Sequence, residues 1–317
     1  MSTSILSLLF ASLVELRNYL FDSGFIRKCY PKFPTISIGN ISFGGTGKTP
    51  FVIYLSNLLL NLGYKPIILS RGYKGKHRGI TIVRDDDKIL CDVAQAGDEL
   101  YLVAKRIQSP VIASKKKFKA IPTINKNLVG NVLIIDDGFQ HRKIERDLDI
   151  VLIDSETVKK PFVYPKGCLR EPLRNLNRAN VIALAEDVLP HSIDKELLSN
   201  KTIIRYKKAV KYLIDLLSKP VELQRVVDKR VVLISGLANN AQFYNTVANL
   251  GIEIYQHFQF KDHYTYSEED IRKILRYASS MNIDTIITTE KDFYKLHGFS
   301  ELFKTSYVNL FSTILDL

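Results

Sequence analysis

The segment from residue 34 to residue 50 constrains this chain more than any other, because an apolar run breaks there into glycines followed by a lysine and a threonine. Small residues let the backbone curl so that successive N–H groups point at one anion, and a helix starting at Lys48 adds the positive end of its dipole. Lys48 would then reach the β- and γ-phosphates of a nucleotide, and Thr49 would bind Mg²⁺. The segment therefore predicts a phosphate-binding loop made by Gly44, Gly45, Thr46, Gly47, Lys48 and Thr49.

The match to the pattern G-x-x-x-x-G-K-[ST] is incomplete, because Ser42 stands where the first glycine belongs. The alternative is a glycine-rich turn before an amphipathic helix. We favour the phosphate loop, since strand, Gly-Lys-Thr and helix arrive in the order that the chemistry needs. The loop alone names no reaction.

A second signal lies at residues 131–141, where four apolar residues lead into Asp136 and Asp137. This is the Walker B form, in which a buried strand delivers a carboxylate to Mg²⁺. An ordinary buried strand ending in an Asp-Asp-Gly turn is the alternative. The phosphate loop makes nucleotide hydrolysis or phosphoryl transfer the leading interpretation.

Composition and charge bound the class of protein. The chain has 317 residues, 46% hydrophobic and 25% charged, which is ordinary for a folded protein of about two domains. Three scattered cysteines without a C-x-x-C pair argue against a disulfide framework or a structural zinc site, and so indicate a reducing cytoplasm. A net charge of +12 indicates anionic partners, which could be nucleic acid, phosphorylated substrates or a membrane surface.

The first segment, residues 4–26, has apolar residues at helical spacing, but Glu15 interrupts it. Its uninterrupted apolar part is shorter than the ~20 residues that span a bilayer. No small-residue cleavage site follows, so a cleaved signal peptide is not expected. Arg27 and Lys28 follow directly, which favours a helix lying in the headgroup layer of an anionic membrane over a helix packed on its own domain core.

Several polar residues follow predicted strands or open predicted helices. Arg71 stands at the carboxyl end of a strand, where α/β sheets bind ligands, although a solvated arginine fits the position equally. Asp98 and Glu99 open a helix, which capping alone would explain. The lysines at 115–119 are either a solvated charge run or contacts to phosphate or lipid headgroups. His263 follows a later strand, where a surface-loop histidine without a task is the simpler interpretation.

The strand and helix pattern restarts after residue 200, with strands expected at 229–236, 252–258 and 283–287. The predicted fold is α/β: a P-loop NTPase-like domain with a mostly parallel sheet, a smaller second α/β domain and an N-terminal amphipathic helix. The predicted limits are 1–30 for the helix, 31–225 for the P-loop domain and 226–317 for the last domain.

Together the motifs resemble one family, the tetraacyldisaccharide 4′-kinases that phosphorylate the lipid A precursor. The family's blocks recur in order over nearly the whole chain: Gly39-Asn40 through Gly44–Pro50, Leu69–Tyr73, Gly97–Glu99, Asp136–His141, Leu169–Pro172, Asp262-His263 and Thr289–Asp292. Seven ordered blocks are far more specific than a phosphate loop. The family also uses an N-terminal apolar helix at the inner membrane.

The resemblance implies a kinase that moves the γ-phosphate of ATP, with Mg²⁺, to the 4′-hydroxyl of a tetraacylated, 1-phosphorylated glucosamine disaccharide. It implies Asp98 as the base for the sugar hydroxyl and His263 as its partner, in a cleft between domains. The implied metal ligands are Thr49, Asp136 and Asp137, and the implied substrate contacts are Arg71, Tyr73 and Arg170. The implied location is the cytoplasmic face of the bacterial inner membrane, with its anionic surface as a partner and no nucleic acid.

Two departures from the family pattern concern Leu100, where proline is usual, and the segment after Ala113, which is rich in lysine rather than arginine. One rival is a membrane-associated P-loop switch ATPase or GTPase of the partitioning or metal-insertion type. Such proteins place a lysine before the paired glycines, where this chain has Phe43. A nucleic-acid-binding ATPase is a second rival, but no aromatic and basic RNA motif supports it.

Overall fold

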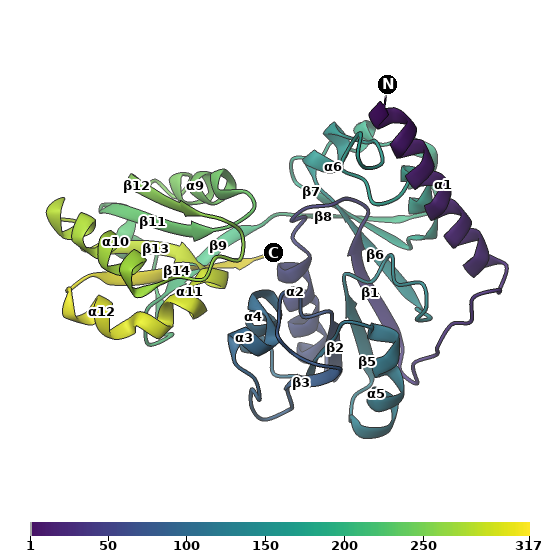
Figure 1. Ribbon diagram of the computed structural model, residues 1–317, viewed down its shortest axis with the longest axis horizontal. Coiled ribbons are helices and arrows are strands. Elements are labelled where there is room, and N and C mark those ends of the chain that lie inside the picture. Colours follow the sequence, from purple (N-terminus) through teal and green to yellow (C-terminus); the bar gives the residue numbers. More distant parts are fainter. Residues whose placement is uncertain (1) are drawn as a thin grey trace. The chain divides into compact units, whose positions relative to one another are not determined.

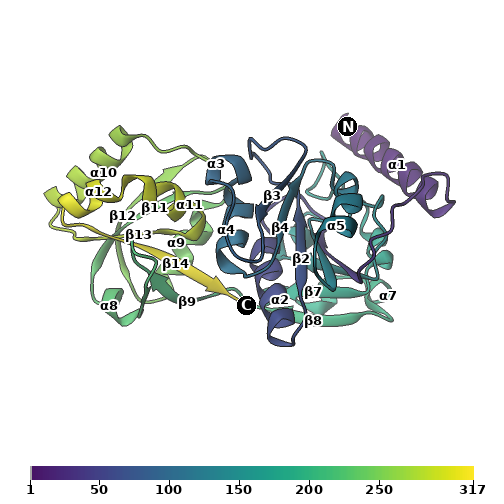
Figure 2. The same cartoon turned by 90° about the horizontal axis from the view of Figure 1, so that it is seen from below.

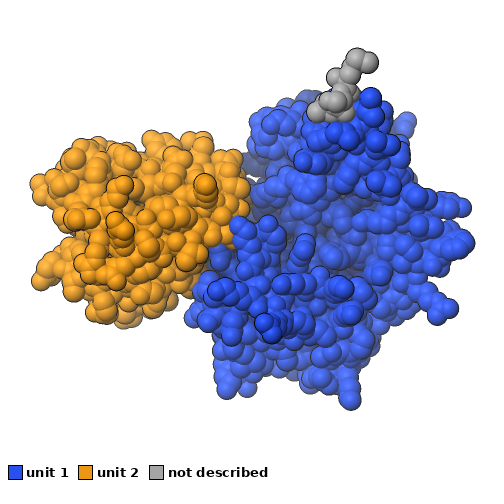
Figure 3. Space-filling model, in the orientation of Figure 1, with its two compact units in different colours: residues 1–207, 317 blue, residues 208–316 orange. Residues whose placement is uncertain are grey.

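The computed structural model describes residues 2–317. The chain divides into two compact units, the first comprising residues 1–207 with Leu317 and the second residues 208–316 (Figure 3). Each unit is built around its own sheet. The predicted α/β fold, with mostly parallel sheets and an N-terminal apolar helix, is confirmed.

The first unit contains an eight-stranded sheet in the order β3-β4-β2-β5-β1-β6-β7-β8 (Figure 1). All neighbouring strands pair in parallel except β3, which is antiparallel to β4. The strands are β1 (Thr35–Asn40), β2 (Pro66–Ser70), β3 (Ile80–Arg84), β4 (Val111–Ser114), β5 (Val132–Asp136), β6 (Leu148–Ile153), β7 (Val181–Ala185) and β8 (Thr202–Tyr206). The helices are α1 (Ser2–Asp22), α2 (Lys48–Asn61), α3 (Val93–Ala96), α4 (Asp98–Arg106), α5 (Ile121–Asn127), α6 (Ser155–Lys159) and α7 (Lys195–Leu198), with short 3₁₀ helices at Lys117–Ala120, Leu173–Arg178 and Pro190–Ser192.

The inner strands of this sheet are apolar on both faces because helices cover both. On one face, Ile68 of β2 and Ile134 of β5 pack with residues of α2 and α4. On the other face, Leu69 and Ile135 of the same strands pack with α5. Figure 2 shows β2 and β4 between α4 and α5. Burial on both faces explains why the strands read as continuous apolar runs rather than as alternating patterns.

This topology decides where polar groups gather. The central strand β1 lies between β5 and β6, and the chain leaves it through the glycine loop to enter α2. The carboxyl ends of β1, β2 and β5 therefore lie side by side at one edge of the sheet. Ligands of open parallel sheets bind at such edges, next to the strand where the connections change direction.

The second unit contains a six-stranded sheet in the order β10-β9-β14-β13-β11-β12. Its inner part is parallel, and β9 and β10 are added antiparallel at one side. The strands are β9 (Ala209–Ile214), β10 (Pro220–Val221), β11 (Arg230–Gly236), β12 (Glu253–Phe260), β13 (Thr285–Thr289) and β14 (Asn309–Asp316). The helices are α8 (Gln224–Val227), α9 (Asn240–Ala248), α10 (Glu268–Ser280), α11 (Glu290–Leu296) and α12 (Ser300–Thr305), with a 3₁₀ turn at His297–Phe299.

The boundary predicted between residues 225 and 226 differs from this division of the chain. The strand β9 forms a ladder with β14, so its residues join the second unit through backbone hydrogen bonds. Leu317 instead packs against the apolar cluster of the first unit. Composition gives no signal for either, because both depend on pairing between segments far apart in the sequence.

Candidate active site

Two glycines with positive φ angles shape the phosphate loop. Gly44 has φ 127° and Gly47, which precedes α2, has φ 93°. Residues with a Cβ are strained there, so glycine is required at both positions. Ser42 occupies the place of the missing first glycine, and its hydroxyl lies 2.8 Å from the Thr157 hydroxyl of α6. The serine that replaces the first glycine of the motif thus joins the start of the loop to α6 by a hydrogen bond.

Lys48, at the start of α2, lies beside a carboxylate from the end of β5. Its Nζ is 3.6 Å from Oδ1 of Asp137, and Arg170 Nη1 donates to both oxygens of the same carboxylate at 2.8 and 3.1 Å. Burial alone raises the pKa of Asp137, but Lys48, Arg170 and Lys117 together hold it well below its usual range. Asp137 is therefore an anion between cations, in the region where a nucleotide phosphate is expected.

Lys117 corrects one part of the sequence interpretation. The lysines at 115–119 were expected to be solvated or to contact phosphate or lipid, yet Lys117 is fully buried. Its Nζ donates to the backbone carbonyls of Asp136 and, at 2.9 Å, Asp137. Burial lowers the pKa of Lys117 to about 8, against the opposing effect of the two aspartates. Its role is to hold the aspartate turn, and the exposed lysines of the run are Lys115, Lys116 and Lys119.

The hydroxyl of Thr49 and the carboxylates of Asp136 and Asp137 are the predicted ligands of a magnesium ion. Thr49 Oγ1 donates to Glu99 Oε2 at 3.5 Å, and Asp136 Oδ2 accepts from Ser70 at 2.6 Å. Within residues 2–317, no group of three or more His, Cys, Asp and Glu side chains is arranged to hold a metal. This sparse donor set fits Mg²⁺ bound with substrate phosphates, because that ion keeps several waters and takes only one or two protein carboxylates.

Asp98 is brought to the site by close packing of two backbone loops. It begins α4, and Gly97 before it has φ 84°. A Cβ on Gly97 would lie 2.4 Å from the carbonyl oxygen of Tyr73, so glycine alone permits this approach. The contact between Thr49 and Glu99 joins the first turns of α2 and α4. The structure thus places Asp98 next to the Arg71–Tyr73 loop and close to the start of the phosphate-loop helix.

In the second unit, the predicted blocks meet at the carboxyl ends of its parallel strands. His263 follows β12, with Nε2 3.6 Å from Oδ2 of Asp262, and Lys291 Nζ is 2.6 Å from the other oxygen of Asp262. Asp292 is fully buried and accepts hydrogen bonds from Gly236 N and Thr289 Oγ1, both at 2.8 Å. The family blocks of this unit therefore form one polar cluster.

Most of the large apolar side chains of α1 are exposed, whereas two of its polar side chains are buried. Phe21 is buried, and Ser7 and Asn18 are buried against the first unit, with Ser7 Oγ accepting from Lys166 N at 2.9 Å. By length and composition, Ser4–Asp22 meets the requirement for a membrane span, and only 17% of this segment is buried within the protein. Its exposed apolar side chains are Ile5, Leu6, Leu8, Leu9, Leu13, Leu16 and Tyr19. This arrangement is the reverse of a helix packed on its own apolar core.

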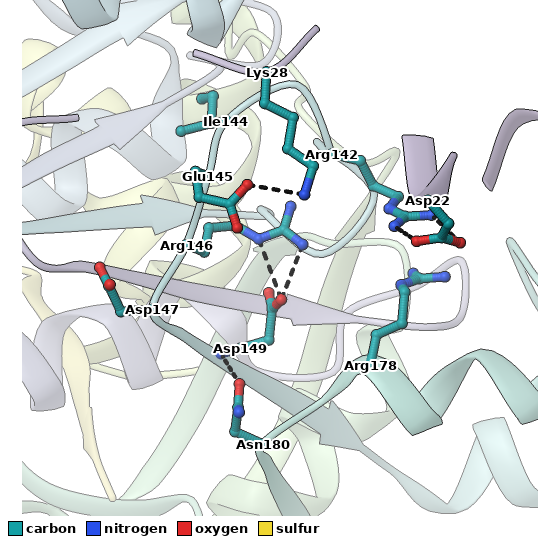
Figure 4. A pocket seen from close by; sticks show the side chains of 10 residues that line it. All are labelled: Asp22, Lys28, Arg142, Ile144, Glu145, Arg146, Asp147, Asp149, Arg178 and Asn180. Atoms are coloured by element: carbon teal, nitrogen blue, oxygen red, sulfur yellow. Dashed lines mark hydrogen bonds and ion pairs between the residues drawn. The ribbon is translucent and has the colours of Figure 1, made fainter. Parts of the chain in front are cut away.

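A polar cavity of about 270 Å³ lies away from the phosphate loop, beside the amino ends of β6 and β7 (Figure 4). Four basic and four acidic residues line it, together with Ile144 and Asn180. The residues pair with one another; for example, Arg146 Nη2 donates to Asp149 Oδ2 at 2.9 Å. Because these charges balance, the cavity has no marked preference for an anionic lipid or nucleotide.

His141, at the end of the second motif, gives a pH prediction. Burial, reinforced by Lys117, lowers its pKa from 6.5 to about 3. His141 therefore takes up a proton below about pH 6.5 in the unfolded chain, but only below about pH 3 in the folded protein. Between these pH values the free energy of unfolding decreases as the pH is lowered. We expect His141→Gln to reduce the loss of unfolding free energy between about pH 7 and pH 5 by about 1 kcal/mol, allowing for partial exposure.

Urea unfolding at the two pH values measures this difference. The exposed His191→Gln variant is the matched control and should keep the wild-type pH dependence. An equal acid loss in wild type and His141→Gln would show that His141 is not the group that titrates.

The sequence analysis assigned no role to three residues near the site, Lys117, Gln140 and Glu171, although the last two lie in family blocks. Glu171 is fully buried and accepts from Arg178 Nη2 and Gln140 Nε2, both at 2.8 Å. Arg178 is seven positions from Glu171, but Gln140 and Glu171 are 31 positions apart and Lys117 and Asp136 are 19 apart, so periodicity within one helix or strand could not indicate these contacts.

A glycine loop between a parallel strand and a helix, with the Asp136–Asp137 turn beside its lysine, defines a P-loop nucleotide-binding protein. The particular family follows from comparison with known proteins. The family model described as "Tetraacyldisaccharide-1-P 4′-kinase" matches residues 2–314. The chain belongs to this family, which confirms the resemblance.

Individual relatives agree with this assignment. A tetraacyldisaccharide 4′-kinase of Aquifex aeolicus is 35% identical over 95% of this chain and 91% of its own length. Another, of Halothermothrix orenii, is 34% identical over 92% of this chain and 82% of its own length. The crystal structure of the "apo" form of LpxK from Aquifex aeolicus in complex with ATP matches with a TM-score of 0.82 and 34% identity, over 98% of this chain and 91% of that one.

Proposed function

We propose that this chain is an ATP-dependent kinase that phosphorylates the 4′-hydroxyl of tetraacyldisaccharide 1-phosphate, the lipid A precursor. The observation that carries the proposal is the pairing of Lys48 with Asp137 at the phosphate loop, in a chain that belongs to the 4′-kinase family. An ATP complex of a relative that matches over 98% of this chain supports ATP as the donor.

The proposed roles combine the geometry of the first unit with the family resemblance. Lys48 binds the β- and γ-phosphates, which replace Asp137 as its partner and neutralise the charge that develops on the transferring group. Thr49 and Asp136 would hold Mg²⁺, with Asp137 beside them, and the ion when bound would offset phosphate charge. Asp98 accepts the proton of the attacking hydroxyl. Arg71, Tyr73 and Arg170 contact the phosphorylated sugar.

The direct test uses purified protein, labelled ATP and the tetraacyldisaccharide 1-phosphate in detergent. We expect a lipid product with one added phosphate and ATP turnover that depends on the lipid. ATP hydrolysis at the same rate without lipid, and no phosphorylated lipid, would support the rival P-loop switch ATPase instead.

We further propose that the enzyme works at the cytoplasmic face of the bacterial inner membrane, held there by the outer face of α1. Six aliphatic side chains of this face are more than half exposed, whereas the inward face carries Ser7 and Asn18. Aliphatic groups gain free energy when they leave water for the interfacial region of a bilayer. Arg27, exposed just after α1, adds attraction to anionic headgroups, whereas Lys28 is paired with Glu145 at 2.8 Å.

Replacing Leu9, Leu13 and Leu16 together by serine tests this membrane contact. We expect at least about a tenfold loss of affinity for anionic vesicles, because three apolar side chains are withdrawn from the interface. Sedimentation with vesicles measures the loss, and nucleotide affinity should not change. The control variant carries Leu62→Ser and Leu90→Ser, two exposed leucines outside α1. Equal vesicle binding by all three proteins would contradict the proposal.

A further inference from the structure

Asn18 is an unusual residue for its place in α1. Its side chain is 4% exposed and lies on the inward face of a helix whose outward face is leucine-rich. Its Nδ2 donates to Glu171 Oε2 at 3.5 Å, and Arg142 Nη1 donates to its backbone carbonyl at 2.9 Å. A buried amide is costly unless it is paired, so these partners fix how α1 is seated.

Glu171 connects α1 to the rest of the site. Besides Asn18, it accepts hydrogen bonds from Arg178 Nη2 on Oε2 and from Gln140 Nε2 on Oε1, both at 2.8 Å. A fully buried carboxylate depends on each such partner, since a lost hydrogen bond leaves part of the charge uncompensated. The orientation of Gln140 is therefore tied to the same carboxylate as Asn18.

From Gln140 the contacts continue to the phosphate loop. Gln140 Nε2 also donates to the backbone carbonyl of Asn40, the last residue of β1, at 2.9 Å, and its Oε1 accepts from Arg170 Nη1 at 3.4 Å. Arg170 in turn holds Asp137, the partner of Lys48. The Glu171 network is this unbroken set of side chains: Asn18, Arg178, Glu171, Gln140, Arg170 and Asp137.

Backbone hydrogen bonds also join the segments that carry the network. Arg170 N donates to Ile41 O at 2.8 Å, and Phe43 N donates to Cys168 O at 2.7 Å. The segment that carries Arg170 and Glu171 thus pairs with the chain that enters the phosphate loop. The two longest hydrogen bonds of the network run from Asn18 Nδ2 to Glu171 Oε2 at 3.5 Å and from Arg170 Nη1 to Gln140 Oε1 at 3.4 Å.

We propose that Asn18 and Glu171 are positioning residues that couple the seating of α1 to the phosphate loop, so that phosphoryl transfer is fastest when α1 is seated. This inference rests on the proposed kinase function. Neither residue is among those assigned to the phosphates, to Mg²⁺ or to the attacking hydroxyl. A helix that binds the bilayer with its outer face would, through its inner face, orient Arg170 and Asp137 for the incoming nucleotide.

The test is the Asn18→Ala variant, assayed with saturating lipid in detergent so that vesicle binding plays no part. We expect kcat to fall about fivefold, the effect of one lost hydrogen bond, while the KM for ATP stays within about twofold of wild type. Vesicle sedimentation should be unchanged, because the outer face is intact.

Asn175→Ala is the matched control. Asn175 Nδ2 donates to Glu15 Oε1 of α1 at 3.1 Å, so this variant also removes one amide-to-carboxylate bond that holds α1, but one outside the Glu171 network. It should keep wild-type kcat. An equal fall in kcat for Asn175→Ala and Asn18→Ala would overturn the inference, because loosening α1 would then explain both.

A double-mutant cycle with Gln140→Ala gives an independent readout. No hydrogen bond joins Asn18 directly to Gln140 among those of the described residues, yet both bond to Glu171. If they act through Glu171, Asn18→Ala should lower kcat much less in the Gln140→Ala background than in wild type. Strictly multiplicative losses would overturn the inference.

Two further arms keep the result decisive. Should Asn18→Ala fold poorly, Asn18→Ser takes its place, because serine keeps a polar group but is too short to reach Glu171, and the same fall in kcat is expected. A wild-type protein that phosphorylates no lipid would overturn the proposed function and the inference with it. An active wild type with fully active Asn18 variants would overturn the inference alone.

Discussion

Replacing Lys48 by alanine is expected to lower the rate of phosphoryl transfer by at least about 10³-fold. The variant loses the cation that neutralises the negative charge developing on the transferring phosphate. The fold should survive, since Lys48 makes its ion pair with Asp137 at 3.6 Å at the edge of the sheet and contributes nothing to the apolar core. Steady-state transfer to the lipid measures the loss.

Lys126→Ala, an exposed lysine of the same unit, is the control and should keep full activity. Circular dichroism and thermal unfolding of Lys48→Ala should match wild type. A variant that keeps most of its activity would show that the phosphate loop is wrongly assigned, whereas an unfolded variant would show that Lys48 is needed for the fold.

Replacing Asp98 by asparagine should lower kcat by about 10² to 10⁴-fold, the usual contribution of a positioned base, with little change in the KM for ATP. Asparagine keeps the size of the side chain but cannot accept the proton of the sugar hydroxyl. The first turn of α4 should persist, because the close approach of Gly97 to Tyr73 does not depend on the carboxylate. Transfer at saturating ATP and lipid is the measurement.

The control for Asp98→Asn is Asp87→Asn, in the exposed turn after β3, which should be fully active. Near-normal kcat for Asp98→Asn would exclude Asp98 as the base. His263→Ala tests the assistance that the resemblance implies: a loss in kcat should appear there and be absent in the exposed His191→Ala. If His263→Ala behaves as wild type, the histidine has no part in the reaction.

The sequence indicated the local parts of the site because each has a local physical cause. A positive φ requires glycine at Gly44 and Gly47, and a strand buried on both faces is apolar along its length, so β1, the phosphate loop and α2 could be recognised in order. The apolar strand β5 ending in Asp136 could be recognised for the same reason.

The tertiary structure decided what depends on distant partners. Lys117 looked like a solvated lysine among lysines, but the fold buries it under the aspartate turn. The strand β9 looked like part of the first domain, yet its hydrogen bonds go to β14 near the end of the chain. In both cases the structural role depends on a partner elsewhere in the chain. The composition and spacing of the residues around Lys117 or β9 do not identify that partner.

The helix α1 combines both kinds of information. Its apolar periodicity was enough to predict a helix with one apolar face, but the sequence left open whether that face meets a membrane or a core. The structure turns that face away from the core of the first unit, and the contact on the opposite face joins Asn18 to Glu171, which are 153 positions apart. Burial of their polar side chains turns the leucines outward, because a buried amide and carboxylate must find each other, whereas aliphatic groups have no such requirement.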